Sequence, residues 1–330
     1  MSITITGGIS FSGGVGIVAP PSVATAGWYG GGELGPSKIS TVNRMTFATD
    51  TATASVRGSL SIARYGIAGA GTLSAGWFSG GYAPSVNPGF LSRIDRITYA
   101  NDTVTATVRG PLATARIYLA ATGNTTDGWY AGGQSAGDIP GSQGMLSTVD
   151  RITYATDTAT ASSRGLLATS RTRYAATGND NYGWFSGGSS LPGPIISSID
   201  RIDYANDTAT ASARGPLSSA RNQIGSTSNS TYGWFGGGYL YPSPSPYEKS
   251  TVDRITFATD TATASVRGPL NIVRQGPQGV GNNDYGWFAT SNSYTTAVSK
   301  ITYATDTATA TASGPLSVGA RMVASTSGIQ

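Results

Sequence analysis

Apolar and polar residues alternate along this chain over stretches of four to nine residues, and no stretch has the spacing of an amphipathic helix. The most regular stretch is Gly-Trp-aromatic-x-Gly-Gly, which reads GWYAGG at residues 128–133. In an extended chain, Trp129 and Tyr130 point to opposite faces of a sheet. A sheet with a large aromatic side chain on each face has to be covered on both faces. The pattern therefore predicts an all-β protein built from packed sheets.

The aromatic stretch recurs, with variation, six times and contains every tryptophan of the chain. Successive tryptophans are 49 to 55 residues apart, and they are Trp28, Trp77, Trp129, Trp184, Trp234 and Trp287. A period of about 50 residues with some drift in length is typical of a repeat protein in which each repeat is one structural unit.

Each unit reads as four short strands joined by turns. In one unit the predicted strands are residues 116–123, 128–133, 147–155 and 158–162. A tight turn at Thr156-Asp157 separates the last two, and there we expect the Asp157 side chain to accept hydrogen bonds from the following backbone N–H groups. Four antiparallel strands repeated six times predict a six-bladed β-propeller.

The end of the chain carries a copy of the first strand that the beginning lacks. Six arginines start such copies, namely Arg64, Arg116, Arg171, Arg221, Arg274 and Arg321. The first Gly-Trp pair, at Gly27, has no such strand before it. We therefore predict that the C-terminal strand pairs with residues 27–32 and closes the ring, which removes an open sheet edge that would invite aggregation.

The N-terminal segment lies outside the repeat, and its apolar residues all fall on odd positions. They are Ile3, Ile5, Ile9, Phe11, Val15 and Ile17. This period of two predicts a strand or a bent hairpin with one apolar face, and Ala19-Pro20-Pro21 then reads as a stiff linker. We divide the chain into an anchor and linker, residues 1–26, and a propeller, residues 27–330. The anchor either adds to the sheet of another protein or self-associates; alternatively, it folds back on its own propeller.

Composition excludes several classes of site. The chain has no cysteine and no histidine, so disulfides, Cys/His metal sites and histidine-based catalysis are ruled out. It has two glutamates, Glu33 and Glu248, and most aspartates belong to the repeat. We therefore expect no enzyme, no catalytic residue, no cofactor and no metal site. A net charge of +4 with only 12% charged residues also argues against nucleic-acid binding, and no run of 18 apolar residues suggests membrane insertion.

Arginine recurs at three positions of the repeat and aspartate at two. One interpretation is a ring of arginines that grips an anionic ligand, such as a phosphorylated sugar. The other is a set of Arg–Asp pairs and backbone hydrogen bonds that lock each blade to the next. Near-identical copies in six units favour the second interpretation, because a site for one ligand does not need six equivalent residues.

The connections between the second and third strands differ most from unit to unit, and variable loops on a rigid scaffold are a usual place for recognition. They are residues 33–39, 82–91, 134–146, 189–196 and 239–249. The candidate binding residues in them are Tyr82, Tyr239, Tyr241 and Tyr247, since tyrosine offers a flat apolar face and a polar tip to a sugar or a protein. The last three could instead pack over the prolines of their own loop. Tyr182, Tyr232 and Tyr285, before the Gly-Trp pairs, form a weaker second candidate.

The order of these features resembles the kelch repeat. Tyr99-Ala-Asn-Asp-Thr-Val-Thr-Ala is similar to the family's Tyr-Asp-Pro-x-Thr-x-x-Trp stretch, and Arg109-Gly-Pro-Leu-Ala-Thr-Ala-Arg116 to its Met-Pro-x-x-Arg stretch. The family's fourth-strand tryptophan is Ala or Thr here, and the sixth unit has Thr290-Ser291 in place of Gly-Gly. The resemblance implies a diverged, kelch-like six-bladed propeller.

A second resemblance concerns the N-terminus. Residues 3–14, ITITGGISFSGG, are similar to the starts of structural proteins of tailed phages, particularly cyanophages, and the Ala-Thr-Asp-Thr-Ala-Thr-Ala repeat resembles repeats in such proteins. It implies a tail, fibre or capsid-associated protein of the virion. Residues 1–20 would dock to other virion proteins, with a homo-oligomer as one form of assembly, and the propeller would recognise a protein or a host-surface polysaccharide. The alternatives are a soluble, lectin-like carbohydrate-binding propeller and an enzyme that cleaves surface polysaccharide.

Overall fold

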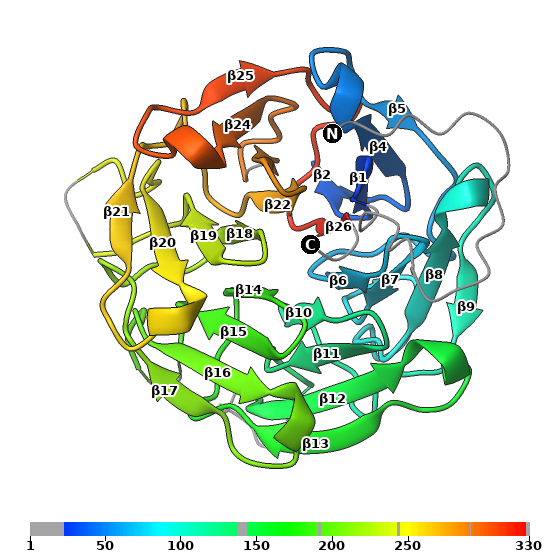
Figure 1. Cartoon of the computed structure of the whole chain (residues 1–330). Helices are drawn as coiled ribbons and strands as arrows, with labels where there is room; N and C mark the ends of the chain where they lie inside the picture. The colour runs from blue at the N-terminus through cyan, green and yellow to red at the C-terminus, as the bar shows by residue number, and fades with distance from the viewer. Residues whose placement is uncertain (1–22, 137–143, 191–192, 243–244, 291, 328–330) are drawn as a thin grey trace, which may run out of the picture.

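Six four-stranded antiparallel sheets are arranged around a central channel, as a computed structural model of the chain shows (Figure 1). The structure describes residues 23–136, 144–190, 193–242, 245–290 and 292–327. The sheets are the blades of a six-bladed β-propeller, so the predicted all-β architecture is confirmed. One 3-10 turn follows the third strand of every blade.

Each blade carries its strands in order from the channel to the outside. Blade 1 consists of β26 (Ala324–Thr326), β1 (Ala26–Gly30), β4 (Val42–Thr46) and β5 (Ser55–Val56). Blade 2 consists of β6 (Ala68–Gly71), β7 (Ala75–Ser79), β8 (Ile94–Thr98) and β9 (Thr107–Arg109). Blade 3 consists of β10 (Ala120–Gly123), β11 (Asp127–Ala131), β12 (Thr148–Thr153) and β13 (Ser162–Leu166).

The other three blades repeat this layout. Blade 4 consists of β14 (Ala175–Gly178), β15 (Tyr182–Ser186), β16 (Ile199–Asp203) and β17 (Ser212–Arg214). Blade 5 consists of β18 (Gly225–Ser228), β19 (Tyr232–Gly236), β20 (Val252–Thr256) and β21 (Ser265–Arg267). Blade 6 consists of β22 (Gln278–Gly281), β23 (Tyr285–Ala289), β24 (Val298–Thr302) and β25 (Thr311–Ser313). The remaining elements are the hairpin β2 (Glu33–Leu34) and β3 (Ser37–Lys38), and the turns η1 (Phe47–Thr49), η2 (Tyr99–Asn101), η3 (Tyr154–Thr156), η4 (Tyr204–Asn206), η5 (Phe257–Thr259) and η6 (Tyr303–Thr305).

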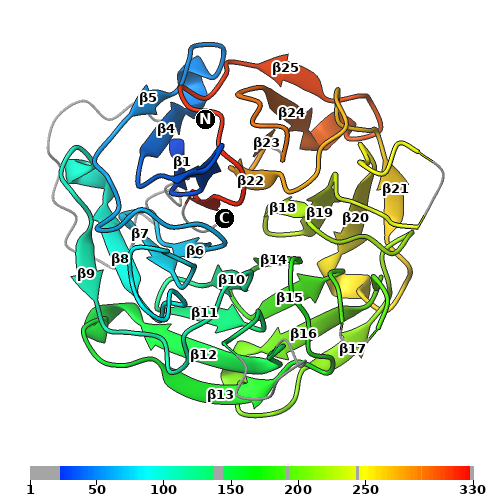
Figure 2. The same cartoon turned by 180° about the vertical axis from the view of Figure 1, so that it is seen from behind.

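The ring closes in blade 1, where the two ends of the propeller meet. β26 pairs antiparallel with β1, with Trp28 opposite Thr326 and Gly30 opposite Ala324. Seen from behind, the C-terminal strand lies beside the first strand of the chain at the channel (Figure 2). The predicted closure by the C-terminal strand is confirmed. In the described part of the chain, the edges of each blade are its innermost strand, which faces the channel, and its outer strand, which is two to five residues long.

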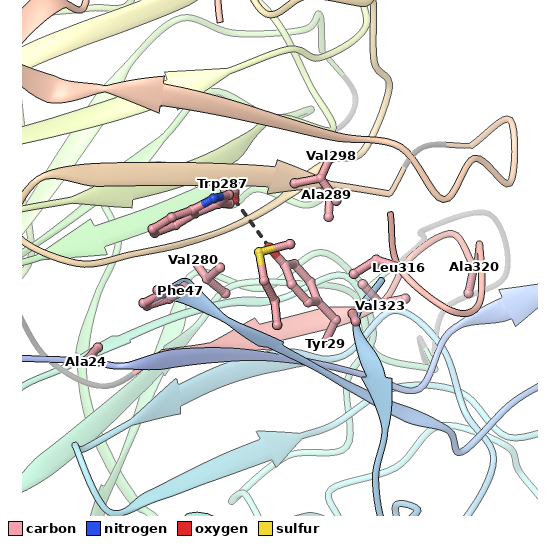
Figure 3. Packing of buried hydrophobic residues seen from close by; sticks show 12 residues of the cluster. Ala24, Tyr29, Phe47, Val280, Trp287, Ala289, Val298, Leu316, Ala320 and Val323 are labelled. Carbon is pink, nitrogen blue, oxygen red and sulfur yellow. Dashed lines mark hydrogen bonds between the residues drawn. The ribbon is translucent and has the colours of Figure 1, made fainter. Parts of the chain in front are cut away.

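The six tryptophans form the contacts between neighbouring blades. Trp287 of blade 6 stacks on Phe47 of blade 1, with ring centroids 4.2 Å apart (Figure 3). The Nε1 of Trp287 donates a hydrogen bond of 2.7 Å to Asp50. Phe47 begins η1 and Asp50 directly follows it. The other five contacts follow the same pattern and pair Trp28 with Tyr99 and Asp102, Trp77 with Tyr154 and Asp157, Trp129 with Tyr204 and Asp207, Trp184 with Phe257 and Asp260, and Trp234 with Tyr303 and Asp306. We call this contact the tryptophan latch.

Each latch aspartate is also the partner of basic side chains from the preceding blade. Asp207 of blade 4 accepts a hydrogen bond of 3.2 Å from Arg151, and Arg164 lies 3.6 Å away, both in blade 3. The equivalent Asp157 is bound by Trp77, Arg96 and Arg109 of blade 2. The expectation that Asp157 serves its own turn is therefore corrected, because its carboxylate holds the preceding blade. These contacts support the interpretation in which arginine and aspartate lock blade to blade.

The aromatic residue after each tryptophan lies on the opposite face of its blade, as predicted. Trp129 packs in the core between blades 3 and 4 with Phe185, whereas Tyr130 packs with Trp77 between blades 2 and 3. The tryptophans are 0% to 5% exposed. Burial of one such side chain removes about 150–250 Å² from water and stabilises the fold by about 4–6 kcal/mol as an upper estimate.

The predicted strand bounds of blade 3 are wrong at several places. The first strand begins at Ala120 rather than residue 116, because Tyr118 has left-handed backbone, and the second ends at Ala131 rather than residue 133, because Gly132 and Gly133 have positive φ. In blade 3 the fourth strand is Ser162–Leu166 rather than residues 158–162, because the backbone before it bonds to blade 2: Ala161 N donates to Pro111 O at 2.8 Å. The third strand ends at Thr153, since Tyr154 starts η3 and stacks on Trp77. Sequence alternation alone could not separate pairing within a blade from pairing between blades.

Candidate functional site

The two faces of the propeller are built from different connections. The loops between the second and third strands lie beside the links between blades, as the hydrogen bond from Gly32 N to Arg64 O (2.8 Å) and the bridge between Tyr65 and Tyr82 show. We call this side the loop face and the side of the 3-10 turns the turn face. The most variable segments of the repeat therefore share one face.

A ring of left-handed residues surrounds the mouth of the channel on the loop face. It consists of the residues two positions before each innermost strand, which have φ between 49° and 74° and are Gly66, Tyr118, Arg173, Gln223, Gly276 and Met322. Backbone hydrogen bonds of 2.6–3.1 Å join neighbouring members, running from Gly66 N to Met322 O and onward from Tyr118 to Gly66, Arg173 to Tyr118, Gln223 to Arg173 and Gly276 to Gln223. We call this set the mouth ring.

Four members of the mouth ring are not glycine, although L-residues rarely adopt this backbone conformation. Tyr118, Arg173, Gln223 and Met322 have φ of 57°, 56°, 49° and 55°. Such backbone costs of order 1–3 kcal/mol at a residue and persists where its surroundings enforce it. Here the five consecutive backbone hydrogen bonds, which join the members from Met322 round to Gly276, enforce it. The consequence is that large side chains of different chemistry stand at the channel mouth.

Four aromatic side chains form a continuous cluster beside the mouth, which we call the aromatic platform. Tyr65 contacts Tyr82 and Tyr118, with ring centroids 5.8 Å and 6.3 Å apart, and Tyr82 meets Phe90 edge-on at 5.5 Å. All four side chains are partly exposed. Tyr82 and Phe90 come from the loop of blade 2, Tyr65 from the link between blades 1 and 2, and Tyr118 from the link between blades 2 and 3.

Charged groups border the aromatic platform. The Lys38 ammonium lies 4.7 Å from the centre of the Tyr65 ring, and the Arg173 guanidinium lies 4.6 Å from that of Tyr118. Glu33 pairs with Lys38 at 2.5 Å and with Arg321 at 3.0 Å. Cations over aromatic rings at an exposed site are worth about 0.5–1 kcal/mol each.

Two pKa shifts define the charge state of this region. Burial, together with Tyr118 and Glu33, raises the pKa of Tyr65 to about 12, so its hydroxyl stays protonated at neutral pH. Burial also acts to raise the pKa of Glu33, but hydrogen bonds from Lys38 and Arg321 outweigh it and lower that pKa. The platform therefore offers the neutral phenol of Tyr65 beside fixed charges.

The predicted binding residues do not come together in one site. Tyr82 belongs to the aromatic platform in blade 2, whereas Tyr239, Tyr241 and Tyr247 lie in the loop of blade 5, across the channel (Figure 1). Tyr247 packs against Tyr239 and Tyr241, with ring centroids 5.7 Å and 5.4 Å apart. Tyr241 is 59% exposed, so this second cluster also presents an accessible ring.

The weaker candidates Tyr182, Tyr232 and Tyr285 serve the packing of their blades. Tyr182 meets Trp184 at 5.9 Å, and the Arg201 guanidinium lies over its ring at 4.3 Å. Tyr232 and Tyr285 repeat this arrangement with Trp234 and Arg254, and with Trp287 and Lys300. They cover the tryptophan latches rather than forming a surface of their own.

Sequence reasoning missed Tyr65, Phe90, Tyr118 and Arg173. The sequence did carry a signal for Tyr118 and Arg173. The second residue after the repeated arginine varies from unit to unit: it is Gly, Tyr, Arg, Gln and Gly after Arg64, Arg116, Arg171, Arg221 and Arg274. Variation at one fixed position within a strict repeat marks a position whose side chain the scaffold does not require. The anchor residues Ile3, Ile5, Ile9, Phe11, Val15 and Ile17 lie outside the described residues.

The channel below the mouth ring is narrow and lined by the innermost strands. Its cavity volume is about 170 Å³, and Thr122, Thr177, Thr227 and Thr326 are among its lining residues. Backbone groups, glycines and short side chains make up the rest of the wall. The wider and chemically richer surface is therefore the loop face around the mouth.

The chain matches no protein-family model and no curated protein. Within the described ranges there is no helix with the length and apolar character of a membrane span. In the same ranges, no three His, Cys, Asp or Glu side chains are grouped in a way that could hold a metal ion.

Proposed function

We propose that this protein is a non-catalytic structural component of a tailed-phage particle whose propeller binds a surface glycan through the aromatic platform. The observation that carries the binding role is the continuous cluster of Tyr65, Tyr82, Phe90 and Tyr118 on the loop face. Aromatic faces that also carry hydroxyl groups suit the apolar and polar faces of a sugar ring. The place in the virion, and the kelch-like character of the blades, rest on the sequence resemblances.

The path of the chain supports display of this face. The chain enters β1 on the turn face, where Thr25 O accepts a hydrogen bond from Phe47 N (2.9 Å) and Ala24 packs in the same core as Phe47 and Trp287. The platform lies on the opposite, loop face. A propeller held through residues 1–22 would thus turn the aromatic platform away from its attachment.

The repeated aspartates support binding rather than catalysis. Those of the 3-10 turns are held by tryptophan and basic side chains, and Asp95, Asp150, Asp200 and Asp253 pair with buried arginines at 2.7–3.0 Å. These carboxylates are committed to the scaffold, whereas the aromatic platform is accessible and joins side chains of several connections in one surface.

The proposed binding surface predicts that removal of one platform ring weakens glycan binding. Tyr118→Gly removes one ring but suits the left-handed backbone at φ 57°, so the fold is expected to remain. On a glycan array and then by titration of the best-bound oligosaccharide, we expect about a tenfold loss of affinity. The matched control is Gln223→Gly, with φ 49° on the far side of the mouth ring. Equal affinities of the two variants would rule out the platform as the binding surface.

The place in the virion is tested by deleting residues 1–20 in the phage. We expect mass spectrometry of purified particles to find the full protein in stoichiometric amounts. The deleted form should be absent from particles, while the purified propeller keeps its melting temperature. The alternative function is a lectin that acts as a free protein, and the aromatic platform is the observation that favours it. It would be absent from particles in either form and would keep its glycan binding after the deletion.

A further inference from the structure

A buried arginine without an anionic partner distinguishes blade 6 from its neighbours. In blades 2–5 the arginine before the first strand is buried and pairs with an aspartate of the third strand. The pairs are Arg64–Asp95, Arg116–Asp150, Arg171–Asp200 and Arg221–Asp253, at 2.7–3.0 Å. In blade 6 the arginine is Arg274, and Ser299 stands where the aspartate would be.

Arg274 is completely buried. Its Nε donates to Ser299 Oγ at 3.2 Å and its Nη1 to Thr290 O at 3.1 Å, whereas its Nη2 has no hydrogen-bond partner. Burial lowers the pKa of Arg274 to about 10, an effect that Tyr29 partly offsets, so the side chain still carries its charge at neutral pH. A buried cation without an anion is costly, and structures normally supply a counter-charge.

Blade 1 shows the alternative outcome, in which both partners are lost. Ala320 stands at the position of the buried arginine and Asn43 at that of the aspartate, while Arg321 is displaced by one residue and pairs with Glu33 on the loop face. The sequence interpretation that Arg321 is the sixth equivalent arginine is therefore corrected. Among the described blades, blade 6 keeps the cation and lacks the anion.

The other blades show what surrounds the missing carboxylate. There the aspartate accepts from the guanidinium and also from a backbone N–H just after the buried leucine of the link, for example Ser61 N to Asp95 at 2.9 Å and Ser218 N to Asp253 at 3.1 Å. Asn271 follows the corresponding Leu270 in blade 6. The amide oxygen of Asn271 accepts a hydrogen bond from the Ser299 hydroxyl. Both groups are neutral, so neither supplies a negative charge to Arg274 Nη2.

We propose that blade 6 binds a small monovalent anion, such as chloride, in the place that the aspartate carboxylate has in blades 2–5. Arg274 Nη2 and the backbone N–H of Asn271 are the donors that hold it. Serine is shorter than aspartate by two heavy atoms, and the Asn271 side chain that reaches Ser299 is exposed, so it has to turn outward for one small ion to enter. The anion neutralises the charge at the interface that closes the ring, where Tyr29 of blade 1 meets blade 6 (Figure 3).

The test compares the melting temperature of the intact protein in sodium chloride and in sodium gluconate at equal ionic strength. A tenfold excess of chloride over its dissociation constant should raise the melting temperature by about 2 °C relative to gluconate. Ser299→Asp restores the ion pair, so this variant should melt higher in gluconate and show no difference between the two salts. Asp253→Ser creates the same arrangement in blade 5 and should gain a second chloride-dependent shift.

A direct measurement keeps the inference testable if a variant does not fold. Crystals of the wild-type protein soaked in bromide should give an anomalous peak next to Arg274 Nη2, and crystals of Ser299→Asp should give none there. Equal melting temperatures of the wild type in both salts, or a chloride effect that persists in Ser299→Asp, would overturn the proposal.

Discussion

Removal of residues 320–330 is expected to prevent the propeller from closing. These residues include β26, which pairs with β1 and whose Ala324 packs with Trp28 and Phe78 in the core between blades 1 and 2. Without it, β1 presents an unpaired edge to the channel and this core opens to water. We expect the truncated chain to elute as aggregate in size-exclusion chromatography and to be cleaved rapidly by protease under conditions in which the full chain resists.

A shorter truncation provides the matched control. Removal of residues 328–330 alone leaves β26 whole and should leave both the elution volume and the melting temperature unchanged. A synthetic peptide of residues 315–330 should restore part of the monomer peak to the longer truncation, because an added strand can complete an open sheet edge. A monodisperse truncated monomer with the melting temperature of the full chain would show that the closing strand is dispensable.

Asp207→Ala is expected to give the largest loss of stability among single substitutions in the turns. The change leaves Trp129 Nε1 buried without an acceptor and deprives Arg151 and Arg164 of their partner. Loss of one partner of a buried ionic group costs about 3–5 kcal/mol, which for a chain of 330 residues lowers the melting temperature by about 6 °C. Differential scanning calorimetry measures the shift, and Thr208→Ala, at the neighbouring exposed position, should leave the melting temperature unchanged.

A double-mutant cycle separates the latch from a general effect of the turn. Trp129→Phe keeps an aromatic ring stacked on Tyr204 but removes the indole donor, so Asp207→Ala should cost less in this background than in the wild type. Strictly additive losses would mean that the bond between Trp129 and Asp207 contributes no stability of its own.

The strict parts of the repeat made the architecture predictable. The six regularly spaced tryptophans predicted the number of blades, and the extra first strand at Arg321 indicated where the ring closes. The alternation of Trp129 and Tyr130 predicted that blades are covered on both faces. Each of these inferences depends on the order of residues within one unit, which the sequence displays directly.

The same reasoning favoured Arg–Asp pairs between neighbouring blades, but it could not say which residues pair. The bond from Trp77 to Asp157 joins residues of two neighbouring blades, and a repeat of period 50 offers an equivalent aspartate in every unit. The mouth ring was hidden because Tyr118, Arg173 and Gln223 carry no preference for left-handed backbone, which the backbone hydrogen bonds between neighbouring links impose on them. The one-residue displacement of Arg321 became visible only through the register of β26 with β1.

The position of β1 between β4 and β26 also determines how the propeller resists tension. Trp28 is opposite Arg44 on one side and Thr326 on the other, so a pull on the chain before Ala26 loads two hydrogen-bond ladders at once. Such a pull runs along the strand and shears the ladders in parallel, whereas a pull across a sheet edge unzips one bond at a time. A particle that drags this domain through a viscous medium would therefore strain the strongest direction of its first blade.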